Sequence, residues 1–122
     1  MAYQLTIEER PTYVYARVDG DLTPANALRF LQEAHAACVK CGRSDVLLDM
    51  QLHGPNLNTT SVYDVISQRA ADGGKLRKIA YVPLQQDDRS MAHFAETVAI
   101  NRGVNVRLFE SVAAAERWLS EP

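Results

Sequence analysis

Hydrophobic and polar positions near the N-terminus alternate with the period of a β-strand. Tyr3, Leu5 and Ile7 alternate with polar residues, and a second β-branched and aromatic run extends from Tyr13 to Val18. The segment between the two runs contains Pro11 and is long enough for a turn only. The pattern therefore predicts two strands that form an antiparallel hairpin.

The segment after this hairpin has the period of an amphipathic helix, and both of its ends are marked. Thr23 is the expected N-cap, Pro24 takes the first helical position, and Gly42 ends the helix. The apolar face carries Ala27, Leu31, Ala34, Cys38 and Cys41. The opposite face is expected to carry Asn26, Arg29, Glu33 and Lys40. Such a helix lies with its apolar side on a sheet.

The rest of the chain alternates between short apolar runs and helical patterns. The continuous apolar run from Val46 to Leu48 predicts a strand that is covered on both faces. The other predicted elements are a helix at about Thr60 to Ala71, a strand at Lys78 to Val82, a helix at Ser90 to Arg102, a strand at Val104 to Phe109 and a last helix in the segment SVAAAERWL. The order ββαβαβαβα predicts an α/β fold with a mostly parallel five-stranded sheet and an antiparallel first strand.

Length and charge narrow the classes of function. A chain of 122 residues is long enough for one domain, and no linker or repeat divides it. The net charge of -2, from 13 basic and 15 acidic residues, predicts no binding of nucleic acid. No apolar run reaches the ~20 residues that span a bilayer, and the N-terminus lacks the pattern of an export signal. We therefore expect a cytoplasmic protein without a membrane span.

The segment LLDMQLHGP raises the question whether Asp49 accepts a phosphoryl group, as the aspartate of a bacterial receiver domain does. A receiver also needs an acidic pair after its first strand, a hydroxyl after its fourth and a lysine after its fifth. Here the acidic pair Glu8 and Glu9 leads into a hairpin, and the last two strands end in YVPL and RLFE. The pattern favours a structural Asp49, which we expect to hydrogen-bond the backbone amides of the loop that follows.

The order of elements, taken with the segments VDGDLTPAN, LLDM and NTTSVYDVI, resembles the STAS domains and their SpoIIAA-like relatives, known from anti-sigma-factor antagonists. The C-terminal third, FAETVAINRGVNVRLFESVAAAERWL, is similar to small single-domain bacterial SpoIIAA-like proteins. The resemblance implies one SpoIIAA-like domain over residues 1–122. It also implies a regulatory role, with a kinase or an anti-sigma-like factor as partner.

In antagonists of this kind, an Asp-Ser-Ser begins the helix after the strand that ends in Asp, and one serine is phosphorylated. The matching positions here are Asn58, Thr59 and Thr60. The resemblance therefore implies Thr59 and Thr60 as candidate phosphorylation positions. Asparagine and threonine stand where the antagonists have acidic and serine residues.

We expect the loop from Met50 to Leu57 and the helix start after it to form the contact site for a partner or ligand. The candidate residues are His53, Asn58, Thr59, Thr60 and Ser61. A helix N-terminus stabilises an anion through its unpaired amides and its partial positive charge. Plain N-capping by Asn58 or Thr59 is the alternative explanation of these residue types. The leading hypothesis is a module without enzymatic activity that binds a protein partner here.

A rival hypothesis is a small-molecule or lipid-binding protein. Its ligand would occupy a groove at the same sheet edge, between the loop Met50 to Leu57 and the segment Pro83 to Arg89. Open parallel sheets bind ligands beyond the carboxyl ends of their strands. The hypothesis otherwise rests on analogy with lipid carriers whose fold has been compared with this one.

The sequence predicts no cofactor and no metal site. Cys38 and Cys41 form a C-x-x-C, but they lie in the last turns of a helix, where no helix N-terminus lowers a thiol pKa. With His35 they supply three zinc ligands but lack a fourth, so we expect both cysteines in the core. The exposed first strand, Tyr3 to Glu8, is a candidate for pairing with a second copy in a homodimer.

Overall fold

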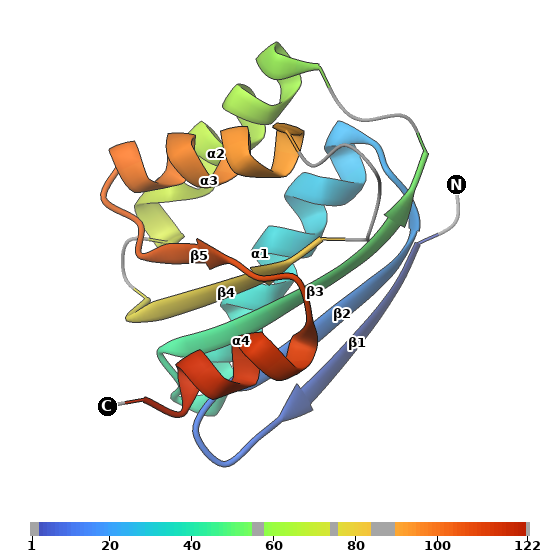
Figure 1. The fold of residues 1–122 in the computed structure, drawn as a ribbon. Coiled ribbons are helices and arrows are strands. Elements are labelled where there is room, and N and C mark those ends of the chain that lie inside the picture. The colour runs from blue at the N-terminus through green and yellow to red at the C-terminus, as the bar shows by residue number, and fades with distance from the viewer. Residues whose placement is uncertain (1–2, 55–57, 74–75, 84–89, 122) are drawn as a thin grey trace.

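The computed structural model describes residues 3–54, 58–73, 76–83 and 90–121. Five strands and four helices follow one another along the described chain (Figure 1). Their bounds are β1 (Tyr3–Glu9), β2 (Val14–Asp21), α1 (Pro24–Cys41), β3 (Asp45–His53), α2 (Thr59–Gly73), β4 (Lys78–Val82), α3 (Ser90–Asn101), β5 (Val106–Leu108) and α4 (Val112–Leu119).

The strands cross the sheet in chain order, from β1 at one edge to β5 at the other. β1 and β2 are antiparallel, and their register runs from Tyr3 opposite Gly20 to Glu9 opposite Val14. The strands from β2 to β5 are all parallel. These findings confirm the predicted α/β fold and the antiparallel first strand.

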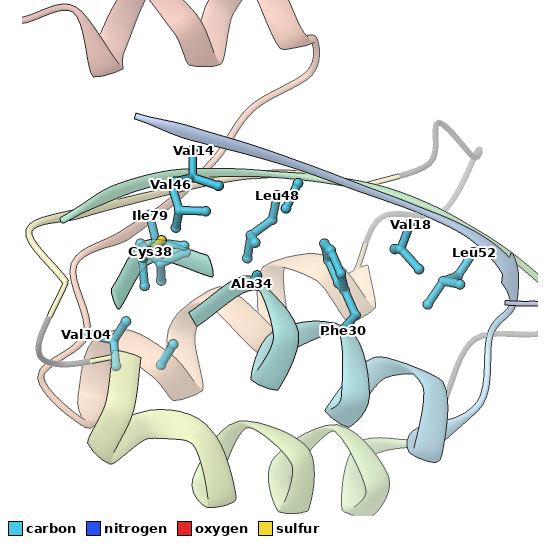
Figure 2. Packing of buried hydrophobic residues seen from close by; sticks show 13 residues of the cluster. Val14, Val18, Phe30, Ala34, Cys38, Val46, Leu48, Leu52, Ile79 and Val104 are labelled. Atoms are coloured by element: carbon cyan, nitrogen blue, oxygen red, sulfur yellow. The ribbon is translucent and has the colours of Figure 1, made fainter. Parts of the chain in front are cut away.

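The three helices that connect the parallel strands cover one face of the sheet, and α4 covers part of the other (Figure 1). Right-handed crossovers between neighbouring parallel strands place all their helices on one side. The larger core lies on that side and includes Phe30 of α1 together with Val18 and Leu52 (Figure 2). A smaller core joins Trp118 of α4 to Leu47 of β3. Both faces of β3 are therefore buried, as its apolar run predicts.

Helix α1 begins and ends as its sequence predicts. The Thr23 hydroxyl accepts a hydrogen bond from the Asn26 amide, Pro24 opens the helix, and Gly42 has φ 67° in the left-handed region. The expectation for the Asn26 side chain is wrong, because this residue is buried. Its Nδ2 donates to the Asp21 carbonyl at 2.8 Å, which ties the first turn of α1 to the end of β2.

The main difference from the predicted elements concerns β3. The apolar run ends at Leu48, but the strand continues to His53 because parallel pairing with β2 extends as far as Asp21 opposite His53. Residues 50–53 therefore belong to a strand, and the predicted loop from Met50 is wrong for these four positions. Leu52 is buried in the core. At the edge of the sheet opposite β1, strand β5 is shorter than predicted and covers Val106–Leu108 only.

Candidate functional site

The first turn of α2 carries the predicted contact residues at the carboxyl end of β3. Asn58 is the N-cap, since its Oδ1 accepts a hydrogen bond from the Ser61 amide at 2.8 Å and its carbonyl accepts one from the Val62 amide. Asn58 and Thr60 are exposed, and Ser61 is partly exposed. The side chain of Thr59 lies outside the described residues. The capping role predicted for Asn58 is confirmed.

His53 is the last residue of β3, and its side chain is exposed. Its carbonyl accepts a hydrogen bond from the Leu22 amide at 2.7 Å, which holds the end of β3 beside the end of β2. Residues 55–57 and 84–89, which would form most of the predicted groove, lie outside the described residues. The part of the site that the structure describes is therefore the end of β3 and the start of α2.

An aromatic and a basic side chain meet further along the outward side of α2. The Arg102 guanidinium lies 4.6 Å from the centre of the Tyr63 ring. Its Nε donates to the Ser67 hydroxyl at 3.0 Å, and its Nη2 donates to the Tyr63 hydroxyl. Tyr63 is 47% exposed although it is large and aromatic. We call Tyr63, Ser67 and Arg102 the α2 patch.

The α2 patch is continuous with the first turn of the helix. Residues three and four apart are neighbours on a helix surface, so Thr60 adjoins Tyr63 and Tyr63 adjoins Ser67. Ile100, at the end of α3 and two residues before Arg102, is also an exposed apolar side chain. The first turn of α2 and the α2 patch thus form a surface of mixed chemistry, with an aromatic ring, hydroxyl groups and one positive charge.

Arg102 follows α3 directly and contacts the neighbouring helix α2. Gly103 has φ 83°, in the left-handed region, and ends the helix region. The Arg102 side chain stacks on Tyr63 of α2 and donates a hydrogen bond to Ser67. A local signal existed for Tyr63: the buried positions Val62 and Val65 fix the inward side of α2 and leave a tyrosine outside it.

Asp49 lies in the middle of β3, on the face that α4 partly covers, and its exposed fraction is only 3%. Its carboxylate accepts hydrogen bonds from the Tyr15 hydroxyl at 2.5 Å and from Gln51 Nε2 at 2.8 Å. The expectation that Asp49 would bind loop amides is wrong, because the strand continues past it. The structural role that the sequence favours for Asp49 agrees with these contacts.

Two tyrosines, Tyr13 just before β2 and Tyr15 within it, donate hydrogen bonds to carboxylates on the α4 side of the sheet. Tyr15 donates to Asp49, and Tyr13 donates to Glu116 of α4. Burial, followed by the hydrogen bond to the carboxylate, raises the pKa of each phenol to about 12. Both contacts need the phenol proton, so they persist only while the tyrosines stay neutral.

Stability is expected to fall in alkaline solution because of these phenols. An unfolded tyrosine loses its proton near pH 10, whereas Tyr13 and Tyr15 keep theirs to about pH 12 in the folded chain. Their contribution is therefore complete below pH 10 and is lost as the pH rises to about 12. Urea unfolding at a series of pH values measures this loss. The double variant Tyr13→Phe and Tyr15→Phe should show a flatter decline, and an unchanged decline would contradict the assignment.

The two cysteines lie where the sequence predicts. Cys38 is fully buried, and burial raises the pKa of its thiol to about 11, so it is protonated at neutral pH. Cys41 is partly buried and packs against the same core. Across the described residues, no cluster of three or more histidine, cysteine or acidic side chains is arranged to hold a metal ion. None of the helices in the described ranges is long and apolar enough to cross a membrane.

The fold and the site define a class: a small α/β domain with sequential strand order, three helices on one face and a helix start exposed at the end of β3. The chain belongs to the SpoIIAA-like family, whose model matches residues 13–120. This family was predicted from the sequence, and the match confirms it. Among curated proteins no match was found.

A solved structure supports the assignment of the fold. It is the crystal structure of an uncharacterised protein of the DUF3478 family, with a SpoIIAA-like fold, from Shewanella loihica PV-4. The two proteins superpose with a TM-score of 0.57 at 18% sequence identity, over 96% of this chain and 93% of the other. At this identity the similarity concerns the fold alone.

Proposed function

We propose that this protein is a regulatory module without enzymatic activity that binds a protein partner with the first turn of α2 and the α2 patch. The observation that carries the proposal is the exposed Tyr63 ring with Arg102 stacked on it. Tyrosine and arginine are enriched among the few residues that supply most of the binding energy at protein interfaces. Holding both side chains in place before binding reduces the entropy lost when a partner arrives.

The chemistry of the surface suggests what the partner presents. A guanidinium has five N–H donors, and contacts with Ser67 and Tyr63 use two of those on Arg102. The others are available to a carboxylate or phosphoryl group on the partner, while the exposed Tyr63 and Ile100 offer area for an apolar side chain. A kinase or an anti-sigma-like factor is the class of partner that the family resemblance suggests. Phosphorylation at Thr60 would add negative charge at the rim of this surface and change which partner docks.

Site-specific photocrosslinking in the native host tests the proposal. A benzophenone amino acid at position 63 or 60 should capture the same protein, and the same probe at Val39, which is 68% exposed on α1, should not. With that protein purified, Arg102→Ala should weaken binding by about 1–2 kcal/mol, which is roughly 5- to 30-fold. Arg117→Ala on α4 is the matched control and should leave the affinity unchanged.

Three outcomes would contradict the proposal. Capture of different proteins from positions 60 and 63, or equal capture at Val39, would mean that the α2 patch is not a specific surface. Retention of a small molecule by the natively purified protein, seen as extra mass under native but not denaturing conditions, would favour the small-molecule or lipid-binding alternative. Extra mass of one phosphoryl group under both conditions, mapped to Thr59 or Thr60, would identify the modification.

A further inference from the structure

The outer edge of β1 is a strand of seven residues that pairs on one side only. In the described chain, β1 has β2 as its single neighbour, and no element lies beyond it (Figure 1). Half of the backbone N–H and C=O groups of such a strand point away from the sheet and can pair with another strand. The side chains from Thr6 to Glu9 are exposed, and they include Ile7, an apolar residue that is 37% exposed.

From this edge we infer that the protein forms a two-fold dimer in which β1 pairs with β1 of a second copy in antiparallel orientation, centred on Thr6. The two sheets then join into one continuous sheet with five strands from each copy. The inference is independent of the α2 patch, whose residues lie on α2 and just after α3 and include none of β1.

The geometry of an antiparallel ladder limits the choice of register. Two residues that lie opposite each other must both direct their backbone N–H and C=O groups towards the partner strand, or both direct them away from it. Because the two strands are identical, an odd-numbered residue can only lie opposite an odd-numbered one, and an even-numbered residue opposite an even-numbered one. The pairing must therefore be centred on a residue, such as Leu5, Thr6 or Ile7. The register centred on Thr6 is the one that pairs all of β1, from Tyr3 to Glu9.

The side chains agree with this register on both faces of the sheet. On the face of α1, Leu5 lies opposite Ile7 of the second copy, so the exposed Ile7 gains an apolar neighbour. On the other face, Glu8 lies opposite Gln4, and the two Glu8 residues stay apart. A register centred on Ile7 would instead place Glu9 against Leu5.

The charges on and beside β1 are compatible with the register centred on Thr6. Glu9 of one copy lies opposite Tyr3 of the other. The Arg29 guanidinium is 4.9 Å from the centre of the Tyr3 ring, and its side chain is 63% exposed. Arg29 pairs with Glu33 at 3.1 Å and Glu9 pairs with Arg43 at 3.2 Å within each copy, so both charges are compensated before the two copies meet. Like charges directly opposite one another would destabilise a strand pair, and this arrangement has none.

Sedimentation velocity over a concentration series tests the dimer. The wild-type chain should form a species of about 27 kDa, twice its 13.6 kDa. Thr6→Glu places two carboxylates opposite each other at the centre of the dimer, whereas in the monomer the new carboxylate faces Arg17 of β2. The dissociation constant of the dimer should rise at least about tenfold, the size of a 1.4 kcal/mol change. Thr97→Glu, the same change at an exposed position of α3, should have no effect.

Disulfide trapping tests the register directly. The two Thr6 residues lie opposite each other, so Thr6→Cys should give a covalent dimer when glutathione disulfide oxidises the two thiols and is itself reduced to two glutathione thiols. Gln4→Cys should not, because Gln4 faces Glu8 and the two Gln4 residues are distant along the strands. The unsubstituted chain, with Cys38 and Cys41, gives the background. A monomer at every concentration, a dimer insensitive to Thr6→Glu, or trapping at position 4 but not at position 6 would overturn the inference.

Discussion

Replacing Phe30 with alanine is expected to lower the free energy of unfolding by about 3–5 kcal/mol. Phe30 is fully buried, and its ring points from α1 to the sheet near Val18 and Leu52 (Figure 2). The substitution removes the apolar area of a whole aromatic ring and leaves a cavity that the surrounding strands cannot fill. Since domains of this size are stable by roughly 5–15 kcal/mol, the variant should be close to unfolding.

Urea unfolding followed by circular dichroism measures this loss. Val39→Ala is the matched control on the same helix, and because Val39 is 68% exposed its effect should stay within about 0.5 kcal/mol. The slope of the free energy against urea should not change between the variants. A loss below about 1 kcal/mol for Phe30→Ala would show that this ring is not in the main core.

Asp49→Ala should cost about 1.5–3 kcal/mol, the range for losing hydrogen bonds to a charged group. The substitution leaves the Tyr15 hydroxyl and the Gln51 amide without their acceptor in a partly buried position. Asp49→Asn should cost less, because its Oδ1 can still accept one of the two bonds. Urea unfolding at neutral pH separates the two variants.

Asp19→Ala is the control for charge removal on the same face of the sheet. Asp19 pairs with Arg17 at 3.1 Å near the surface, and such pairs contribute at most about 1 kcal/mol. The expected order of loss is therefore Asp49→Ala, then Asp49→Asn, with Asp19→Ala last. Equal losses for Asp49→Ala and Asp19→Ala would contradict a structural role for Asp49. In that case the burial of its carboxylate would serve another purpose.

The two proposals have a common consequence. A dimer through β1 would present two α2 patches on one rigid body, related by a two-fold axis. A partner with two matching sites, or a dimeric partner, would then bind more tightly than to one patch, because the second contact is intramolecular. Thr6→Glu separates the proposals: it should weaken binding of a two-site partner and leave the affinity of each single α2 patch unchanged.

Most of the fold could be predicted because its signals are local. The cap at Thr23, the proline at the first helical position and the left-handed Gly42 act within a few residues, so α1 is found with its correct ends. The last helix, Val112–Leu119, follows a Ser111 cap in the same way. The number and order of the strands follow from the alternation of periods, and right-handed crossovers then determine the sheet.

The candidate site could be predicted only in part. Asn58 caps α2 within the same turn, so its role is visible from neighbouring residues. The pairing of Arg102 with Tyr63 joins residues 39 positions apart, and the bond between Tyr15 and Asp49 joins residues 34 apart. Contacts of that kind depend on which helices and strands become neighbours, which no local pattern records.

For this protein, the sequence by itself determined the class of fold, the positions of the helix ends and the residues that begin α2, because each depends on interactions between near neighbours. Tertiary structure alone decided that β3 continues to His53, that Asp49 is enclosed beside Tyr15, and that Arg102 lies on Tyr63. The physical reason is that strand length depends on the neighbouring strand, and side-chain partners depend on the packing of distant segments.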